Sequence, residues 1–553
     1  MALEIVETSC GSIRGALQQG GYKGNVLFKK VPYAKPPIGS RRFKDAEPIE
    51  PWEGVYDATV YAPVPYQRFC DVAPWYRDFY FGQWPAMSED CLYLSVYTGA
   101  ESPSEKRPVY VWFHGGGLNA GWYYEIAFNG NELASKGVVV VSVGQRLNLF
   151  GYLALPQLRG ESGRSGNYGF TDQIMALRWI RENIAAFGGD PDNITIGGQS
   201  GGSQKCCLLA GSPYSNNLFR RAILHSGLKW CQRFQGIEEA EKEGKEFLLA
   251  CGIDPEISPE ELRALPPTSF VPKKQVHIPD TMTYDKDLVP FPVLRTALET
   301  YAGGIDFMCG TNLGEADEFA EIPDLSAYSL NQKREPEIRT REDLVHHVRS
   351  FIQDAKAAEA FVDLVEDAIR EMPLSTPGNV DVDFTDPEHM ARILASLGLA
   401  YPGRVNFSRN LMAARMFGEH MKKKYPAFRN FAYLFAHILP VNENDYHTPY
   451  DPNVQMAYHS SELFYAFSSL RKDVPPTRPW TEDDYLLADQ MSSYWVNFIR
   501  YGTPSGNDPH LPEWGESSDG SYMVFTDHPE SHKGFDCVLD GVISAFVREQ
   551  YFG

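Results

Sequence analysis

The 553-residue sequence is poor in positive charge and has neither a long apolar run nor an internal repeat. Lys and Arg number 51 against 72 Asp and Glu, which gives a formal net charge of −21. Binding to phosphate backbones needs clustered Lys and Arg, so nucleic acid is not an expected partner. No stretch approaches the roughly 20 apolar residues that span a bilayer, so membrane insertion is not expected.

The N-terminus lacks the pattern of a secretory signal. Residues 1–8 have no basic start and no apolar run of signal-peptide length, and they predict an edge strand. We therefore expect a cytoplasmic protein, or a secreted one if a leader has been trimmed. The 9 Cys include no Cys-x-x-Cys pair and no zinc spacing, so neither a metal site nor a disulfide framework is indicated.

Apolar strands and helices do alternate along the sequence, most regularly between residues 109 and 226. Strands are predicted at 109–113, 138–143, 193–196, 221–224 and 431–435, and helices at 170–187, 203–210, 340–372, 407–424 and 484–500. This order indicates an α/β fold, with a mostly parallel central sheet and helices on both faces. No boundary separates two cores, so residues 1–553 are predicted to form a single domain with a helical insertion at roughly 320–430.

The segment Gly198-Gln199-Ser200-Gly201-Gly202 matches the Gly-x-Ser-x-Gly nucleophile elbow. A predicted strand precedes it and a predicted helix follows it, which is the context that the motif requires. Small residues on both sides let the strand and the helix pass closely, and the turn holds the serine in a strained conformation. Ser200 is therefore the predicted nucleophile, at the carboxyl end of the sheet.

A glycine-rich loop, His114-Gly115-Gly116-Gly117, follows the predicted strand at 109–113. Glycines let backbone N–H groups turn toward a developing oxyanion, and the residue after the nucleophile, Gly201, supplies another such donor. His114 is expected to be structural, because it precedes the nucleophile and this arrangement places its base last.

Several further motifs carry a family resemblance. Ser88–Leu94, Gly166–Gly169 and Phe187–Pro191, together with the glycine loop and the elbow, resemble the type-B carboxylesterase/lipase (cholinesterase-like) family. The resemblance runs in order from about Gly11 to Gly506. It implies one α/β-hydrolase domain whose helical insertions form a gorge above the active site. It also implies Gly116, Gly117 and Gly201 as the oxyanion donors.

The catalytic acid and base should follow the nucleophile in that order. On the family pattern of a strand, a glycine and then a glutamate, Glu315 matches the acid, and Asp317 and Glu318 are rivals by proximity. His459 matches the base, because two small residues, an acid and an apolar residue follow it. A neutral His459 would take the Ser200 proton and Glu315 would orient its ring.

Other histidines have weaker claims to the role of base. His437 ends a predicted strand and His447 lies in a Pro/Asp-rich loop, so a strand-end hydrogen bond and a surface position explain them.

Three residues are predicted to contact the substrate: Gln199, Trp84 and Phe464. The family often has Glu before the nucleophile, so Gln199 removes a charge and favours a small neutral or aromatic ester over a choline-type one. Trp84 belongs to an aromatic run between Cys70 and Cys91, a pair that resembles the one closing a loop in secreted members. The sequence leaves open whether these two thiols are joined.

The predicted function is hydrolysis of a small-molecule carboxylic ester through an acyl-Ser200 intermediate, with no metal and no organic cofactor. Two alternatives remain. An amidase or carbamate hydrolase would use the same triad, because one acyl-enzyme serves all three substrates. A non-catalytic, adhesion-type relative would have lost the nucleophile or the base. The oligomeric state is not predicted.

Overall fold

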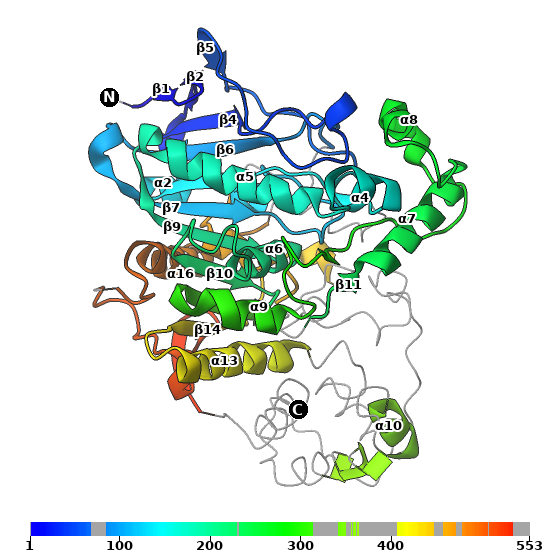
Figure 1. Ribbon diagram of the computed structural model, residues 1–553. Helices are drawn as coiled ribbons and strands as arrows, with labels where there is room; N and C mark the ends of the chain where they lie inside the picture. The colour runs from blue at the N-terminus through cyan, green and yellow to red at the C-terminus, as the bar shows by residue number, and fades with distance from the viewer. Residues whose placement is uncertain are drawn as a thin grey trace.

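The computed structural model describes residues 2–67, 84–228, 232–312, 341–349, 355–356, 358–360, 362–363, 406–446, 457–471, 478–506 and 508–534. An 11-stranded sheet runs through this part of the chain (Figure 1). In spatial order its strands are β16 (Pro529–Lys533), β15 (Ser521–Phe525), β14 (Asn430–Phe435), β13 (Asp306–Asn312), β10 (Arg221–His225), β9 (Gly189–Gln199), β7 (Arg107–Phe113), β8 (Val139–Val143), β6 (Tyr93–Thr98), β4 (Val26–Pro32) and β3 (Ala16–Leu17).

The centre of the sheet is parallel and its two ends are antiparallel. Pairing is parallel from β8 through β7, β9, β10, β13 and β14 to β15, and antiparallel between β15 and β16 and among β8, β6, β4 and β3. The predicted mostly parallel sheet is confirmed. The predicted N-terminal edge strand also forms, but it belongs to a separate small sheet of β1 (Ile5–Thr8), β2 (Gly11–Arg14) and β5 (Val55–Asp57).

Strand β7 shows how both faces of the sheet are covered. Val109, Val111 and Phe113 pack into one core, and Tyr110 and Trp112, which alternate with them, pack into another. The period of two along a strand sends neighbouring side chains to opposite faces. This is why the strand is a continuous apolar run.

Helices α5, α6 and α13 lie over one face, and α16 covers the other (Figure 1). The helices of the described chain are α2 (Asn131–Ser135), α3 (Asn148–Tyr152), α4 (Pro156–Ser162), α5 (Tyr168–Asn183), α6 (Gly201–Ala210), α7 (Ile237–Cys251), α8 (Pro259–Ala264), α9 (Leu294–Tyr301), α10 (Arg341–Val348), α13 (Asn406–Lys424), α15 (Leu463–Ala466) and α16 (Glu482–Tyr501). Among these helices none is both long and apolar enough to cross a bilayer.

Part of the predicted helical insertion lies outside the described residues. Within them, α10 begins where the helix was expected, and α13 packs directly on the sheet through Phe417, whose ring lies 5.2 Å from that of Phe307 on β13. A single domain over residues 1–553 stays a prediction.

Candidate active site

Ser200 occupies the turn between β9 and α6. Its backbone has φ 55° and ψ −119°, a region that a side chain rarely adopts, and its N–H donates to the carbonyl of His225 at 2.9 Å. A Cβ on Gly202 would lie 2.0 Å from the Phe113 carbonyl oxygen, so only glycine lets α6 start this close to β7. The elbow forms as predicted, and it presents Ser200 at the carboxyl end of the parallel strands.

The glycine loop after β7 lies against this elbow. Phe113, the last residue of β7, pairs with Gly198 of β9, so the two strands end at the same edge. Gly116 and Gly117 have positive φ angles of 79° and 62°, which turn the loop back toward Ser200. A Cβ on Gly201 would lie 2.3 Å from the carbonyl oxygen of Gly117. The three predicted oxyanion donors are therefore neighbours in space.

Lys205 and His114 lie behind the glycine loop and are fully buried. The Lys205 ammonium donates to the His114 carbonyl at 3.0 Å, which fixes the start of the loop. Burial lowers the pKa of Lys205 to about 7 and raises the pKa of nearby Glu125 to about 8. Burial also holds the pKa of His114 well below its usual range, so this ring is neutral, as expected of a structural histidine.

His459 contacts the residue that precedes the nucleophile. Its Nε2 lies 2.9 Å from the side-chain Nε2 of Gln199. An amide nitrogen only donates, so His459 Nε2 accepts and carries no proton. This is the ring state that a general base needs in order to take a proton from Ser200.

The predicted acid, Glu315, lies outside the described residues, as do its rivals Asp317 and Glu318. The strand that leads to it is described. Asn312, the last residue of β13, donates to the Tyr458 carbonyl at 2.7 Å. The end of β13 is thereby tied to the residue directly before His459.

A buried polar cluster lies beneath His459, and sequence reasoning missed it. Glu462 accepts from Asn312 Nδ2 at 2.5 Å, and its other oxygen lies 3.3 Å from His225 Nδ1. Trp495 Nε1 donates to His225 Nε2 at 3.1 Å, so this ring is neutral with its proton on Nδ1. Nδ1 faces the hydroxyl of Tyr433 at 2.9 Å. The sequence signal for this cluster was Glu462, the acid three residues after His459. In the structure Glu462 anchors the turn that follows His459.

The predicted substrate-contact residues are spread over different surroundings. Gln199 is buried against His459. Trp84 is exposed, and its ring lies 6.4 Å from that of Trp122, five residues after Gly117. Phe464 lies in the core on the α16 side, 5.7 Å from the Trp480 ring. Cys91 is a buried thiol, and its suggested partner, Cys70, lies outside the described residues.

The two weaker histidine candidates are also accounted for. His437 bonds Asp484 and Asp527, each at 2.9 Å, which agrees with a strand-end hydrogen-bonding role. His447 lies outside the described residues. In the described part of the chain, no group of three or more His, Cys, Asp or Glu is arranged to hold a metal ion.

A serine on a strained strand-to-helix turn, at the carboxyl end of a parallel sheet and beside a glycine loop, defines the α/β-hydrolase class. Comparison with solved structures agrees. A structure of PNB esterase matches with a TM-score of 0.71 and 25% identity, over 100% of this chain and 99% of that one.

Sequence comparison gives the family. The profile described as "Carboxylesterase family" matches residues 2–537. Para-nitrobenzyl esterase of Bacillus subtilis (strain 168) is 30% identical over 96% of this chain and 98% of its own length. Carboxylesterase 4A of Bos taurus is 28% identical, over 92% and 88% of the two chains. Pyrethroid hydrolase Ces2e of Rattus norvegicus is 29% identical, over 93% and 84%. The chain belongs to the type-B carboxylesterase family and is a carboxylic ester hydrolase.

Proposed function

We propose that the protein hydrolyses small neutral or aromatic carboxylic esters through an acyl-Ser200 intermediate, with His459 as base and Glu315 as acid. The observation that carries the proposal is the meeting of three parts at one edge of the sheet. These parts are the strained Ser200, the Gly117 backbone packed on Gly201, and the Gln199–His459 contact.

The chemistry follows from these positions. Ser200 Oγ attacks the ester carbonyl carbon and its proton passes to His459 Nε2. The oxyanion accepts hydrogen bonds from the N–H groups of Gly116, Gly117 and Gly201, each worth about 3–4 kcal/mol of the barrier. The C–O bond then breaks and His459 returns the proton to the leaving alcohol. Water repeats the sequence on the acyl-enzyme, and Ser200 and the carboxylic acid are released.

The preference for a neutral or aromatic alcohol has two supports. The residue beside His459 is an uncharged amide, so no carboxylate stands there to hold a cationic alcohol. The exposed ring of Trp84 lies against Trp122 close to the glycine loop and offers an aromatic surface. One of the similar proteins is named for para-nitrobenzyl esters.

A panel of p-nitrophenyl esters, acetate through laurate, tests the proposal on the native protein and on Ser200→Ala. We expect turnover in the native protein and its loss by a factor of about 10⁴ or more in the variant. Ser493→Ala, which removes a serine hydroxyl on α16, is the control and should keep full turnover. An organophosphonate should label only chains that retain Ser200, and a matched anilide shows whether amides are also cleaved. Equal turnover in Ser200→Ala would overturn the assignment.

A further inference from the structure

A cavity of about 210 Å³ lies beside the nucleophile. Four segments wall it: the glycine loop, α6, the chain before β11 (Gln235–Gly236) and the chain before β12 (Thr283–Tyr284). The lining is mixed: Asn119, Gln204, Gln232, Asp280 and Thr281 are polar, Leu118, Leu208, Phe234 and Met282 are apolar, and Gly117 contributes its backbone. A cavity of about 150 Å³ is large enough for benzene, so this one has room for a chain of several carbons.

Two contacts connect this cavity to the reacting groups. Gly117, which lines it, packs against Gly201 beside the nucleophile. Gln204, which also lines it, lies one helical turn after Ser200, and its N–H donates to the Ser200 carbonyl at 3.2 Å. A group bound at the ester carbonyl therefore has direct access to the cavity.

The cavity lies on the acyl side of the ester. His459 must reach the oxygen of the leaving alcohol in order to protonate it. Neither His459 nor its contact Gln199 is among the described residues that line the cavity. The alcohol is therefore held near His459, and the acyl chain extends past Gly117 and Gln204.

Asp280 gives the cavity its chemical character. It is the only ionisable residue in the described lining, and its side chain is 17% exposed. Burial raises the pKa of Asp280, and one carboxylate oxygen lies 3.2 Å from Nε2 of His277, whose side chain is half exposed. Gln204, Gln232 and Thr281 are half-buried and line the same space, so a chain end that reaches Asp280 would cover polar groups that a methyl group cannot pair with.

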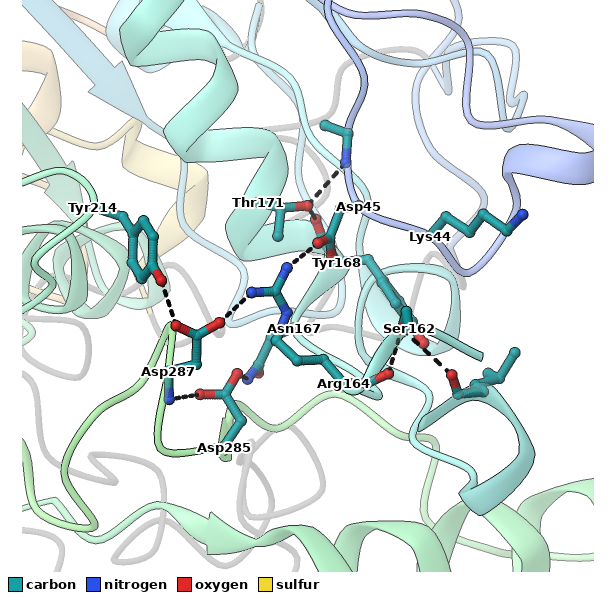
Figure 2. A network of polar contacts seen from close by, with 12 residues as sticks. Lys44, Asp45, Ser162, Arg164, Asn167, Tyr168, Thr171, Tyr214, Asp285 and Asp287 are labelled. Atoms are coloured by element: carbon teal, nitrogen blue, oxygen red, sulfur yellow. Dashed lines mark hydrogen bonds and ion pairs between the residues drawn. The ribbon is translucent and has the colours of Figure 1, made fainter. Parts of the chain in front are cut away.

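The walls are held in place by a frame outside the cavity. β11 and β12 pair in parallel, which joins the two segments that carry Gln232 and Asp280. Asn167 bonds both backbone groups of Thr283, at 2.8 and 2.9 Å. Arg164 bridges Asp45 and Asp287, and Tyr214 donates to Asp287, as Figure 2 shows. The cavity is a preformed part of the fold.

Resting on the proposed function, we propose that this cavity binds the acyl chain of the ester and selects chains that end in a hydrogen-bond donor, a hydroxyl or an ammonium group. The preference for an uncharged group that was argued from Gln199 concerns the alcohol of the ester, whereas Asp280 would contact the far end of the acyl chain. Asp280 would accept from the terminal donor, and the neighbouring amides would complete its hydrogen bonds.

Three esters of equal length test this inference on the native protein: p-nitrophenyl heptanoate, 6-hydroxyhexanoate and 6-aminohexanoate. They differ only in a terminal methyl, hydroxyl or ammonium group. We expect kcat/KM to be higher for both donor-ended esters than for heptanoate, by roughly tenfold for the ammonium ester. The two donor-ended esters separate a need for a donor from a need for charge.

The Asp280→Asn variant keeps the shape of the side chain and removes its charge. We expect the ammonium-to-methyl ratio of kcat/KM to fall by roughly tenfold. Asp254→Asn removes an exposed carboxylate that does not line the cavity, and it should leave the ratio unchanged. The native ratios need no variant, so a misfolded Asp280→Asn chain does not prevent a decision.

The outcomes separate this inference from the proposed function. If the native protein cleaves heptanoate in a Ser200-dependent way but shows no preference for donor-ended chains, the cavity assignment is wrong and the esterase assignment stands. An unchanged ratio in a folded Asp280→Asn chain has the same meaning. If no ester is cleaved, both assignments fall.

Discussion

Gln199 lies against the ring nitrogen of His459 that takes the proton of Ser200 in the proposed mechanism. In the 2.9 Å contact the Gln199 amide donates to His459 Nε2, and it adds no charge to the site. A carboxylate in the same place would instead favour the imidazolium form of the ring. A substitution at this one residue should therefore change the pH dependence of the reaction.

The Gln199→Glu substitution tests this role. We expect the acid limb of the kcat/KM profile to move to higher pH by roughly one unit, because a neighbouring carboxylate favours the protonated ring. The profile is measured with a short-chain p-nitrophenyl ester. Gln19→Glu adds the same charge at an exposed position and should leave the profile in place. An unmoved profile in Gln199→Glu would show that the contact does not govern the base.

Lys205 makes stability depend on pH through a buried charge. Burial lowers its pKa from 10.5 to about 7, so above that pH the folded chain releases a proton that the unfolded chain keeps. Between these two values the unfolded state binds more protons, and the contribution of Lys205 to the free energy of unfolding rises with pH. Below about pH 7 the full cost of the buried charge is present.

Lys205→Met removes this dependence. The free energy of unfolding of the native chain, minus that of the variant, should increase between about pH 6.5 and about pH 9 in urea titrations. Lys423→Met removes an exposed ammonium from α13 and should give a difference that does not change with pH. A pH-independent difference for Lys205→Met would contradict its depressed pKa.

Strand β12 is a two-residue element whose position depends on one side chain. Asn167, at the start of α5, has φ 59°, and it bonds the N–H and the carbonyl of Thr283 and the Asp285 carboxylate. The side chain thus links α5 to the segment that carries Asp280. Without it, two buried backbone groups would lose their partners.

We expect Asn167→Ala to lower the free energy of unfolding by about 2–3 kcal/mol, since buried groups would be left unpaired. Asn216→Ala loses one bond from a half-buried side chain, to the Tyr301 carbonyl, and should cost about 1 kcal/mol. Urea unfolding of the two variants gives the comparison. Equal losses would mean that β12 is held by its other contacts.

Elements with a strong local pattern could be predicted from the sequence. The strands at β7, β8, β9 and β10 and the helices α5, α6, α13 and α16 form within a few residues of the expected bounds, because apolar periodicity determines them. The elbow and the glycine loop were also predictable, since their glycines are local requirements of a tight turn.

Contacts between distant segments could not be predicted in the same way. Trp495 and His225 are 270 residues apart, and no local pattern pairs them. Asp280 lies in a segment without periodicity, so its place in the cavity depends on the β11–β12 pairing and on Asn167. The cluster beneath His459 and the cavity are therefore products of the tertiary fold.

The whole chain carries a formal charge of −21, which places any cationic substrate in an attractive field. We expect kcat/KM for p-nitrophenyl 6-aminohexanoate to fall about threefold as salt rises from about 20 mM to about 300 mM, because the field is screened. The heptanoate ester, which has no charge, is the control and should change little. Parallel losses for both esters would point to a general salt effect.

The packing of Gly117 against Gly201 has a consequence for how this enzyme can be diversified. The carbonyl oxygen of Gly117 occupies the place of a Cβ on Gly201, so a larger residue there requires the glycine loop to move as well. Random single-codon libraries will therefore lose most variants at Gly201, where the space is filled, whereas at Gly117 the limit is its positive φ of 62°. New activities should be more accessible through Asp280 and its neighbours, where a side chain changes without displacing the backbone that the proposed mechanism assigns to the oxyanion.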